Sequence, residues 1–134
     1  MRNKCVDNEM RAMTEFIIGK RCSGKTTELI KRSSETGEII VTGTTVMADC
    51  IRDQAIHMHI NIPKPMSITL FQHVMGGKND NQKLRTYIQQ NGILIDELDL
   101  LLHSLFRGVN VNSVTITDRD DIGNITFLEV KETE

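Results

Sequence analysis

The sequence predicts an α/β fold in which a mainly parallel sheet is flanked by helices. Short runs rich in Ile, Val and Thr alternate with segments whose apolar residues recur every three or four positions. The central strand-like runs are continuously apolar, which is typical of parallel strands covered on both faces. A glycine-containing segment at 19–26 (GKRCSGKT) joins the first such run to the first helical pattern. This alternation implies right-handed βαβ units.

Length and composition limit the domain organisation. A chain of 134 residues is one domain by length, which we expect over 14–130, with a loose tail over 1–13 and a frayed end over 131–134. The net charge of −2 excludes a global basic field that would draw the chain onto nucleic acid. One Tyr, four Phe and no Trp argue against a base-stacking platform for single strands.

The first elements follow from β-branched runs and helix end signals. Thr14–Ile18 is the first expected strand, and the helix after it runs over 25–35. Gly37 suits the position just beyond a helix, where a left-handed backbone is common. The run Glu38–Thr42 predicts a second strand, after which Thr44 can cap another helix.

The middle of the chain continues the alternation. The helix after Thr44 has apolar residues at spacings of 4, 4 and 3, namely Met47, Ile51, Ala55 and Met58. Two prolines within Asn61–Pro65 end it. We expect a short strand at Ser67–Phe71 and a polar connection over Val74–Asn81.

The last third contains the remaining strands and helices. A helix is expected over Gln82–Gln90, a buried strand over Ile93–Asp96 and an amphipathic helix over Leu98–Leu105. Ser113–Thr117 predicts a further strand. The final strand, Ile125–Val130, follows turn-forming residues, so we expect it to lie antiparallel at an edge.

The segment Gly19–Thr26 has the composition of a phosphate-binding loop. Backbone amides of such a loop can surround phosphate oxygens, and the helix N-terminus adds partial positive charge. Lys25 is placed to reach the β- and γ-phosphates, and the Thr26 hydroxyl to bind Mg²⁺. The predicted nucleotide-binding residues of this segment are consecutive: Gly19, Lys20, Arg21, Cys22, Ser23, Gly24, Lys25, Thr26 and Thr27.

Two carboxylates follow the strand Ile93–Ile95 directly. Ligands of α/β sheets sit beyond the carboxyl ends of the strands, so Asp96 is expected at the same rim as the loop. Asp96 would hold Mg²⁺, directly or through water, and Glu97 could deprotonate an attacking water. In isolation this Asp-Glu pair is also what a strand end before a solvated helix start contains.

With these two elements the chain resembles a P-loop NTPase. Gly19–Thr26 is similar to Walker A and Ile93–Glu97 to Walker B. A glutamate beside the Walker B aspartate resembles the RecA-like branch, which includes superfamily 1 and 2 helicases and terminase-type ATPases. The resemblance implies a RecA-like fold, ATP or another nucleoside triphosphate, and Mg²⁺. It also implies a γ-phosphate-sensing role for Thr117, although a Thr-rich strand alone explains that residue.

The chain also departs from those families. It has no room for a second lobe or a nuclease domain, and no arginine finger can be assigned in cis. Arg85, Arg107 and Arg119 are available, and each is more commonly a surface residue. Because efficient turnover often needs such an arginine, we expect weak activity from the isolated chain. In size and motif order the chain is similar to small stand-alone ATPase-like proteins encoded by bacteriophages.

Three functions stay open. The first is a slow NTPase in phage or bacterial DNA metabolism, with a protein partner, with DNA as a candidate partner, and with a homo-oligomer as one source of an arginine in trans. The second is a nucleotide-gated regulatory module, for example an inhibitor of a host replication or defence complex, with little hydrolysis. A small nucleotide kinase is disfavoured, because the sequence has no Arg-rich lid and Asp96-Glu97 resembles hydrolytic machinery.

The cysteines and the hydropathy pattern bear on the compartment. Cys5, Cys22 and Cys50 fit no zinc or redox spacing, and their odd number indicates reduced thiols. Cys22, inside the loop, is either a modifiable thiol or a small filler residue. No apolar run approaches a membrane span and no signal peptide is evident, so we expect a cytoplasmic protein without a membrane.

Overall fold

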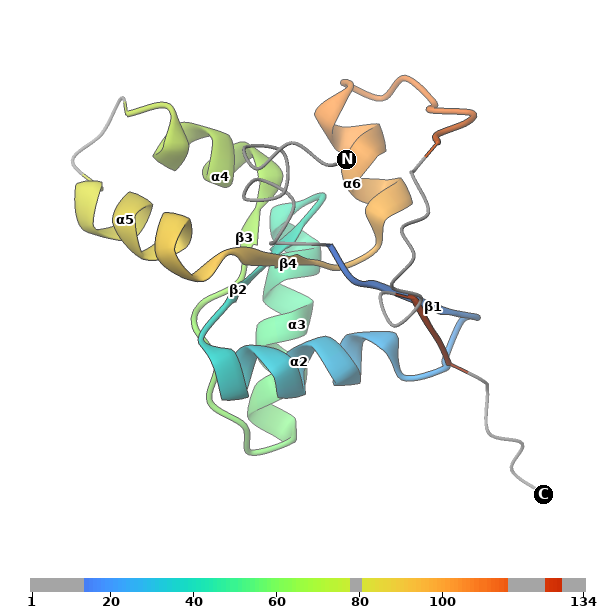
Figure 1. The fold of residues 1–134 in the computed structure, drawn as a ribbon, viewed down its shortest axis with the longest axis horizontal. Coiled ribbons are helices and arrows are strands. Elements are labelled where there is room, and N and C mark those ends of the chain that lie inside the picture. Colours follow the sequence, from blue (N-terminus) through green and yellow to red (C-terminus); the bar gives the residue numbers. More distant parts are fainter. Residues whose placement is uncertain (1–13, 78–80, 116–124, 129–134) are drawn as a thin grey trace, which may run out of the picture. The chain divides into compact units, whose positions relative to one another are not determined.

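The computed structural model describes residues 14–77, 81–115 and 125–128. Its elements in chain order are β1 (Phe16–Gly19), α2 (Lys25–Thr36), β2 (Ile39–Thr42), α3 (Thr45–His57), β3 (Met66–Ser67), α4 (Ile68–Met75), α5 (Gln82–Asn91), β4 (Ile93–Ile95), α6 (Leu98–Leu105) and β5 (Ile125–Leu128) (Figure 1). The chain divides into two compact units: Met1–Lys25 with Thr115–Glu134, and Thr26–Val114. The expected tail and frayed end lie outside the described residues.

The first unit contains a pair of strands, β1 and β5. They run parallel, in a register that aligns Phe16 with Ile125 and Gly19 with Leu128. The expectation of an antiparallel C-terminal strand is therefore wrong. That expectation assumed that the last strand would pair with its neighbour in sequence. It pairs instead with β1, and a parallel pair needs a long connection, which the intervening chain supplies.

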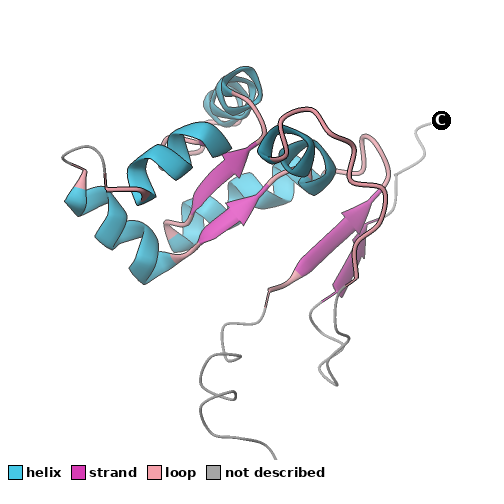
Figure 2. Ribbon diagram, turned by 90° about the horizontal axis from the view of Figure 1, so that it is seen from above, coloured by secondary structure: helices cyan, strands magenta, loops and turns pink. Residues whose placement is uncertain are grey.

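The second unit contains a three-stranded sheet in the order β3-β2-β4, with both pairings parallel. Every residue of β2 is buried. Helices α3, α4 and α6 all contact this central strand (Figure 2). The α/β class and the parallel pairing predicted from the sequence are thus confirmed. A short β-branched run becomes the middle strand because helices can cover it on both faces.

One hydrophobic cluster in the core of this unit is built by residues from five elements. Its buried members come from β2, β3, α4, α5 and α6: Ile39, Val41, Met66, Ile68, Val74, Ile88 and Leu101. Burying an aliphatic side chain of this kind contributes about 1.5–3 kcal/mol. Ile93 of β4 packs against this cluster, and two candidate functional residues, Asp96 and Glu97, follow the carboxyl end of that strand.

The ends of α2 and α3 are formed as the sequence predicts. Gly37 follows α2 with a φ of 81°, and its N–H donates to the Ser33 carbonyl at 2.8 Å. The Thr44 hydroxyl accepts from the Met47 N–H at 3.2 Å and so caps α3. On α3, Ile51 and Ala55 are buried, as the helical spacing indicated.

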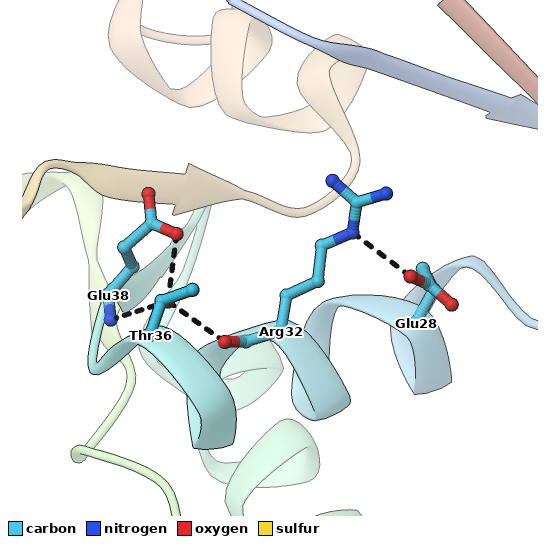
Figure 3. Close-up of polar contacts among 4 residues, drawn as sticks. All are labelled: Glu28, Arg32, Thr36 and Glu38. Atoms are coloured by element: carbon cyan, nitrogen blue, oxygen red, sulfur yellow. Dashed lines mark hydrogen bonds and ion pairs between the residues drawn. The ribbon is translucent and has the colours of Figure 1, made fainter.

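Polar contacts connect α2 to the start of β2 (Figure 3). The Thr36 hydroxyl lies 2.8 Å from both the Arg32 carbonyl oxygen and Glu38 Oε1, and it accepts from the Glu38 N–H at 3.2 Å. Arg32 also pairs with Glu28 one turn earlier, at 3.0 Å. A surface pair at this spacing contributes only about 0.3–0.5 kcal/mol, so the contacts fix local geometry more than stability.

Three sequence expectations about the middle and end of the chain differ from the structure. Of the expected strand Ser67–Phe71, only Ser67 lies in a strand, at the end of β3, because α4 begins at Ile68 and the Ser67 hydroxyl caps it by accepting from the Leu70 N–H at 3.2 Å. Val74, expected in a polar connection, is fully buried in that helix. Residues 113–115 of the expected strand Ser113–Thr117 form no strand, and its last two residues lie outside the described part of the chain.

None of the helices within the described ranges combines the length and apolar character that crossing a membrane requires.

Candidate functional site

The structure brings together the two residues predicted to bind Mg²⁺. Thr26 lies on the first turn of α2, and Asp96 directly follows β4. The Thr26 hydroxyl donates toward the Asp96 carboxylate, at 3.2 Å from Oδ1 and 3.3 Å from Oδ2. Asp96 is only 6% exposed, although it carries a charge. The contact joins residues 70 positions apart and lies wholly within the second unit.

A buried carboxylate needs polar partners, and this one is chemically suited to a hard cation. Mg²⁺ prefers oxygen ligands and is usually held by one or two carboxylates, substrate phosphates and water. The Thr26 hydroxyl and the Asp96 carboxylate supply two such oxygens. Among the residues that the structure describes, no three His, Cys, Asp or Glu side chains gather at one place. A Mg²⁺ ion at this pair would need further oxygen ligands, from phosphate or water.

Glu97, the predicted general base, adopts an unusual backbone conformation. Its φ is 58° and its ψ is 74°, in the left-handed region, and it precedes α6 without a side-chain cap. For a non-glycine residue this conformation costs about 1–2 kcal/mol. Its carbonyl accepts from the Leu101 N–H at 3.0 Å, which helps to hold it. Such strain gathers at functional positions, and here it adjoins Asp96 directly.

In the first unit, the segment after β1 forms a tight turn. The Ser23 N–H donates to the Lys20 carbonyl at 3.1 Å, and Lys25 Nζ donates to the same oxygen at 2.9 Å. Cys22 and Gly24 have positive φ values of 63° and 91°. A Cβ at Gly24 would meet nothing within 4 Å, so its backbone angle, and not space, favours glycine there.

Gly19 is favoured for a different reason, because side-chain atoms of Ser23 and Leu128 approach its backbone closely. A Cβ built there would collide with Ser23 Oγ and lie 3.0 Å from Leu128 Cβ. Ser23 Oγ is buried and has no hydrogen-bond partner, which holds for no other buried side-chain N or O atom in the described ranges. A buried hydroxyl left in this state costs about 1–3 kcal/mol. The loop therefore contains an unused hydrogen-bonding group.

The other predicted residues are placed as follows. Lys20, Arg21 and Cys22 are exposed. Thr27 is half-buried, and its hydroxyl accepts from Gln54 Nε2 of α3 at 3.2 Å, so it joins the two helices. Thr117, the predicted γ-phosphate sensor, lies outside the described residues.

The three arginines that the sequence makes available are placed as follows. Arg85 Nη1 donates to the Val74 carbonyl at 3.3 Å. Arg107 is exposed beyond α6, and Arg119 lies outside the described residues.

Sequence reasoning missed an open pocket of about 1110 Å³ in the second unit. It lies where β2 and β3 end and α3 and α4 begin, and its lining includes Gly43, Thr44, Lys64, Ser67 and His73. The one signal in the sequence was a glycine, Gly43, directly after a buried strand. In the structure a Cβ at this position would lie 2.9 Å from the Leu100 carbonyl oxygen. Neither Thr26 nor Asp96 lines the pocket. We place the candidate phosphate chemistry at that pair, since it joins a hydroxyl to a buried carboxylate.

Comparison with protein-family models, with curated proteins and with solved structures finds no match to this chain.

Proposed function

We propose that this protein binds a Mg²⁺-bound nucleoside triphosphate, with ATP as the first candidate, through Gly19–Thr26, and hydrolyses it slowly. The contact between the Thr26 hydroxyl and the buried Asp96 carboxylate carries the proposal. The sequence assigns these two residues to one metal ion, and they are neighbours in space although distant in the chain. A strand, a turn and a helix start around Lys25, in the order that a phosphate-binding loop requires, give further support. A RecA-like arrangement of the whole fold is part of this proposal.

The proposed reaction divides the work among four side chains. Lys25 and the loop amides would hold the β- and γ-phosphates. Thr26 and Asp96 would hold Mg²⁺, which supplies positive charge to the phosphate oxygens. Glu97 would accept a proton from the water whose oxygen bonds to the γ-phosphorus. As that bond forms, the bond to the β,γ-bridging oxygen breaks, and the products are a nucleoside diphosphate and inorganic phosphate.

No arginine finger can be assigned in cis from the sequence, which supports slow rather than fast turnover. In the second unit, Arg32 pairs with Glu28, and Arg85 donates to a backbone carbonyl of α4. In nucleoside triphosphate hydrolysis, an arginine that stabilises the transferred phosphoryl group increases the rate about 10³–10⁵-fold. We therefore propose that a protein partner or a second copy supplies that charge, in a setting of phage or bacterial DNA metabolism.

The test is Mg²⁺-dependent phosphate release by the purified chain, measured with and without DNA, together with ATP affinity. We expect Lys25→Ala to lose ATP binding, because the Lys25 ammonium is the group placed to reach the β- and γ-phosphates. Glu97→Gln should keep ATP binding but lose roughly 100-fold or more in turnover, since an amide cannot accept the proton.

Lys31→Ala is the matched control, because Lys31 is an exposed lysine of α2. It should leave affinity and turnover near those of the unchanged protein. ATP binding that is absent, or that is equal in Lys25→Ala, would refute the proposed function. Retained turnover in Glu97→Gln would remove only the assignment of the base.

A second candidate, a nucleotide-gated binding module, is favoured by one observation. Several apolar side chains are exposed in the segment after α6: Phe106 at 52%, Val109 at 64% and Val114 at 60%. This segment follows the helix that starts beside Asp96 and Glu97, so a protein partner there could respond to the nucleotide. ATP binding without turnover, with partner capture that differs between ATP and ADP, would support this candidate over the hydrolase.

A further inference from the structure

One backbone carbonyl in the loop accepts hydrogen bonds from two of the groups that a triphosphate would need. The Lys20 oxygen accepts from the Ser23 N–H at 3.1 Å and from Lys25 Nζ at 2.9 Å. An amide and an ammonium are the donors by which loops of this kind hold phosphate oxygens. While it donates to Lys20, the Ser23 amide has no N–H left for a phosphate, and the Lys25 ammonium commits one of its three N–H groups. The carbonyl thus occupies the role that a phosphate oxygen would take.

The Ser23 side chain shows the opposite condition. Its Oγ is buried beside Gly19 and has no hydrogen-bond partner. The residues on either side, Cys22 and Gly24, both have left-handed backbones. The closed turn therefore satisfies the Ser23 amide and leaves the Ser23 hydroxyl unsatisfied. A charged ligand that accepts from this hydroxyl would gain more than an ordinary hydrogen bond provides, because charge-assisted bonds are about twice as strong.

We propose that the Lys20 carbonyl holds the loop in a closed state, and that a bound triphosphate displaces it and takes the Ser23 hydroxyl as an additional phosphate ligand. This inference rests on the proposed nucleotide binding. It adds a side-chain contact and a conformational step to that proposal. Opening exchanges two hydrogen bonds to Lys20 for hydrogen bonds to phosphate oxygens, with no covalent change. It also gives the Ser23 hydroxyl the partner that it lacks in the closed turn.

The inference predicts opposite effects of one substitution on stability and on affinity. Ser23→Ala removes a hydroxyl that destabilises the closed protein and that would bind phosphate in the nucleotide-bound protein. Without nucleotide, its melting temperature should therefore rise by a few degrees. With Mg²⁺ and ATP, its dissociation constant should increase about tenfold, as for a lost hydrogen bond to a charged group. A purely structural role of the serine would move both quantities in the unfavourable direction.

The experiment measures the melting temperature without nucleotide and the Mg·ATP dissociation constant by calorimetry for three proteins. These are the unchanged chain, Ser23→Ala and the control Ser113→Ala. Ser113 is exposed and lies outside helices and strands, so its substitution should change neither quantity. A carbonyl chemical shift measured at Lys20 in the unchanged chain adds a test that needs no variant. We expect it to change when Mg·ATP saturates the protein, because both donors leave.

Each outcome separates this inference from the proposed function. If the unchanged chain binds Mg·ATP but Ser23→Ala binds it equally well, or melts at a lower temperature, the hydroxyl is not an unsatisfied phosphate ligand and the inference is wrong. A Lys20 carbonyl shift that stays constant at saturation would also overturn it. In these cases nucleotide binding still stands. No Lys25-dependent binding by the unchanged chain would overturn both.

Discussion

At the scale of single residues, Asp96 is the one ionisable side chain that is buried in the described part of the second unit. Its carboxylate is nearly inaccessible to water, and the Thr26 hydroxyl lies within 3.3 Å of both carboxylate oxygens. Under the proposed function, a divalent cation would take an oxygen of this carboxylate as a ligand. The role proposed for Asp96 is therefore to hold the metal, and we expect metal binding to depend on this residue.

Asp96→Asn tests that assignment with little change in shape. The amide oxygen can still accept from Thr26, so we expect the fold to survive. The loss of charge should remove the Mg²⁺-dependent part of ATP affinity, which we expect to be tenfold or more in the unchanged chain. The measurement is the ratio of ATP dissociation constants without and with Mg²⁺, which should fall towards one in the variant.

Asp99→Asn is the control for this substitution, because Asp99 is an exposed carboxylate on the first turn of α6. It should keep the ratio of the unchanged chain. An Asp96→Asn protein that keeps the full Mg²⁺ effect would place the metal elsewhere.

At the scale of elements, the sequence predicted best where end signals and periodicity agreed. The helix Leu98–Leu105 has the bounds that its leucines indicated, and the helix over Lys25–Thr36 ends before Gly37 as expected. The prediction failed at residues 68–71, where four β-branched or apolar residues resembled a strand but form the start of α4. The decisive contacts there are tertiary: Val74 is buried against other elements, which favours a helix over the local preference.

The residues of the candidate site also differ in how far the sequence predicts their placement. The Thr26–Asp96 pair could be expected, because each residue belongs to a motif that follows the carboxyl end of a parallel strand, and these ends meet at one edge of a sheet. The turn at Lys20 and the unsatisfied Ser23 hydroxyl could not, because a spacing pattern does not specify which carbonyl an amide or an ammonium selects. The same holds for the left-handed backbone of Glu97, since glutamate has no preference for it.

The N-cap of α3 permits a test of one element. Thr44 is exposed, so its side chain contributes mainly through the hydrogen bond from Met47 N–H. Thr44→Ala should lower the free energy of unfolding by about 1 kcal/mol, measured by urea denaturation, whereas Thr44→Ser keeps the hydroxyl and most of the stability. Equal losses in the two variants would show that the threonine methyl group matters instead of the cap.

At the scale of the whole molecule, ligand linkage gives a test that needs no turnover. At a concentration one hundred times its dissociation constant, Mg·ATP should stabilise the protein by about 2.7 kcal/mol, which corresponds to roughly 10 °C in melting temperature. Lys25→Ala should show little of this shift. An equal shift in that variant would indicate that the nucleotide binds elsewhere, and the open pocket beside Thr44 and Ser67 would be examined next.

The hydrogen bond between Tyr87 of α5 and the residue just beyond α2 has a consequence for spectroscopy. The chain has one tyrosine and no tryptophan, so its fluorescence on excitation in the tyrosine absorption band comes essentially from Tyr87. The hydroxyl of this ring donates to the Gly37 carbonyl at 2.5 Å, just beyond the end of α2 opposite Thr26. The Tyr87 ring is therefore an intrinsic fluorophore that reports on the contact between α5 and the residue after α2. A change in its emission on adding nucleotide would mean that an event at the start of α2 is transmitted along the whole helix.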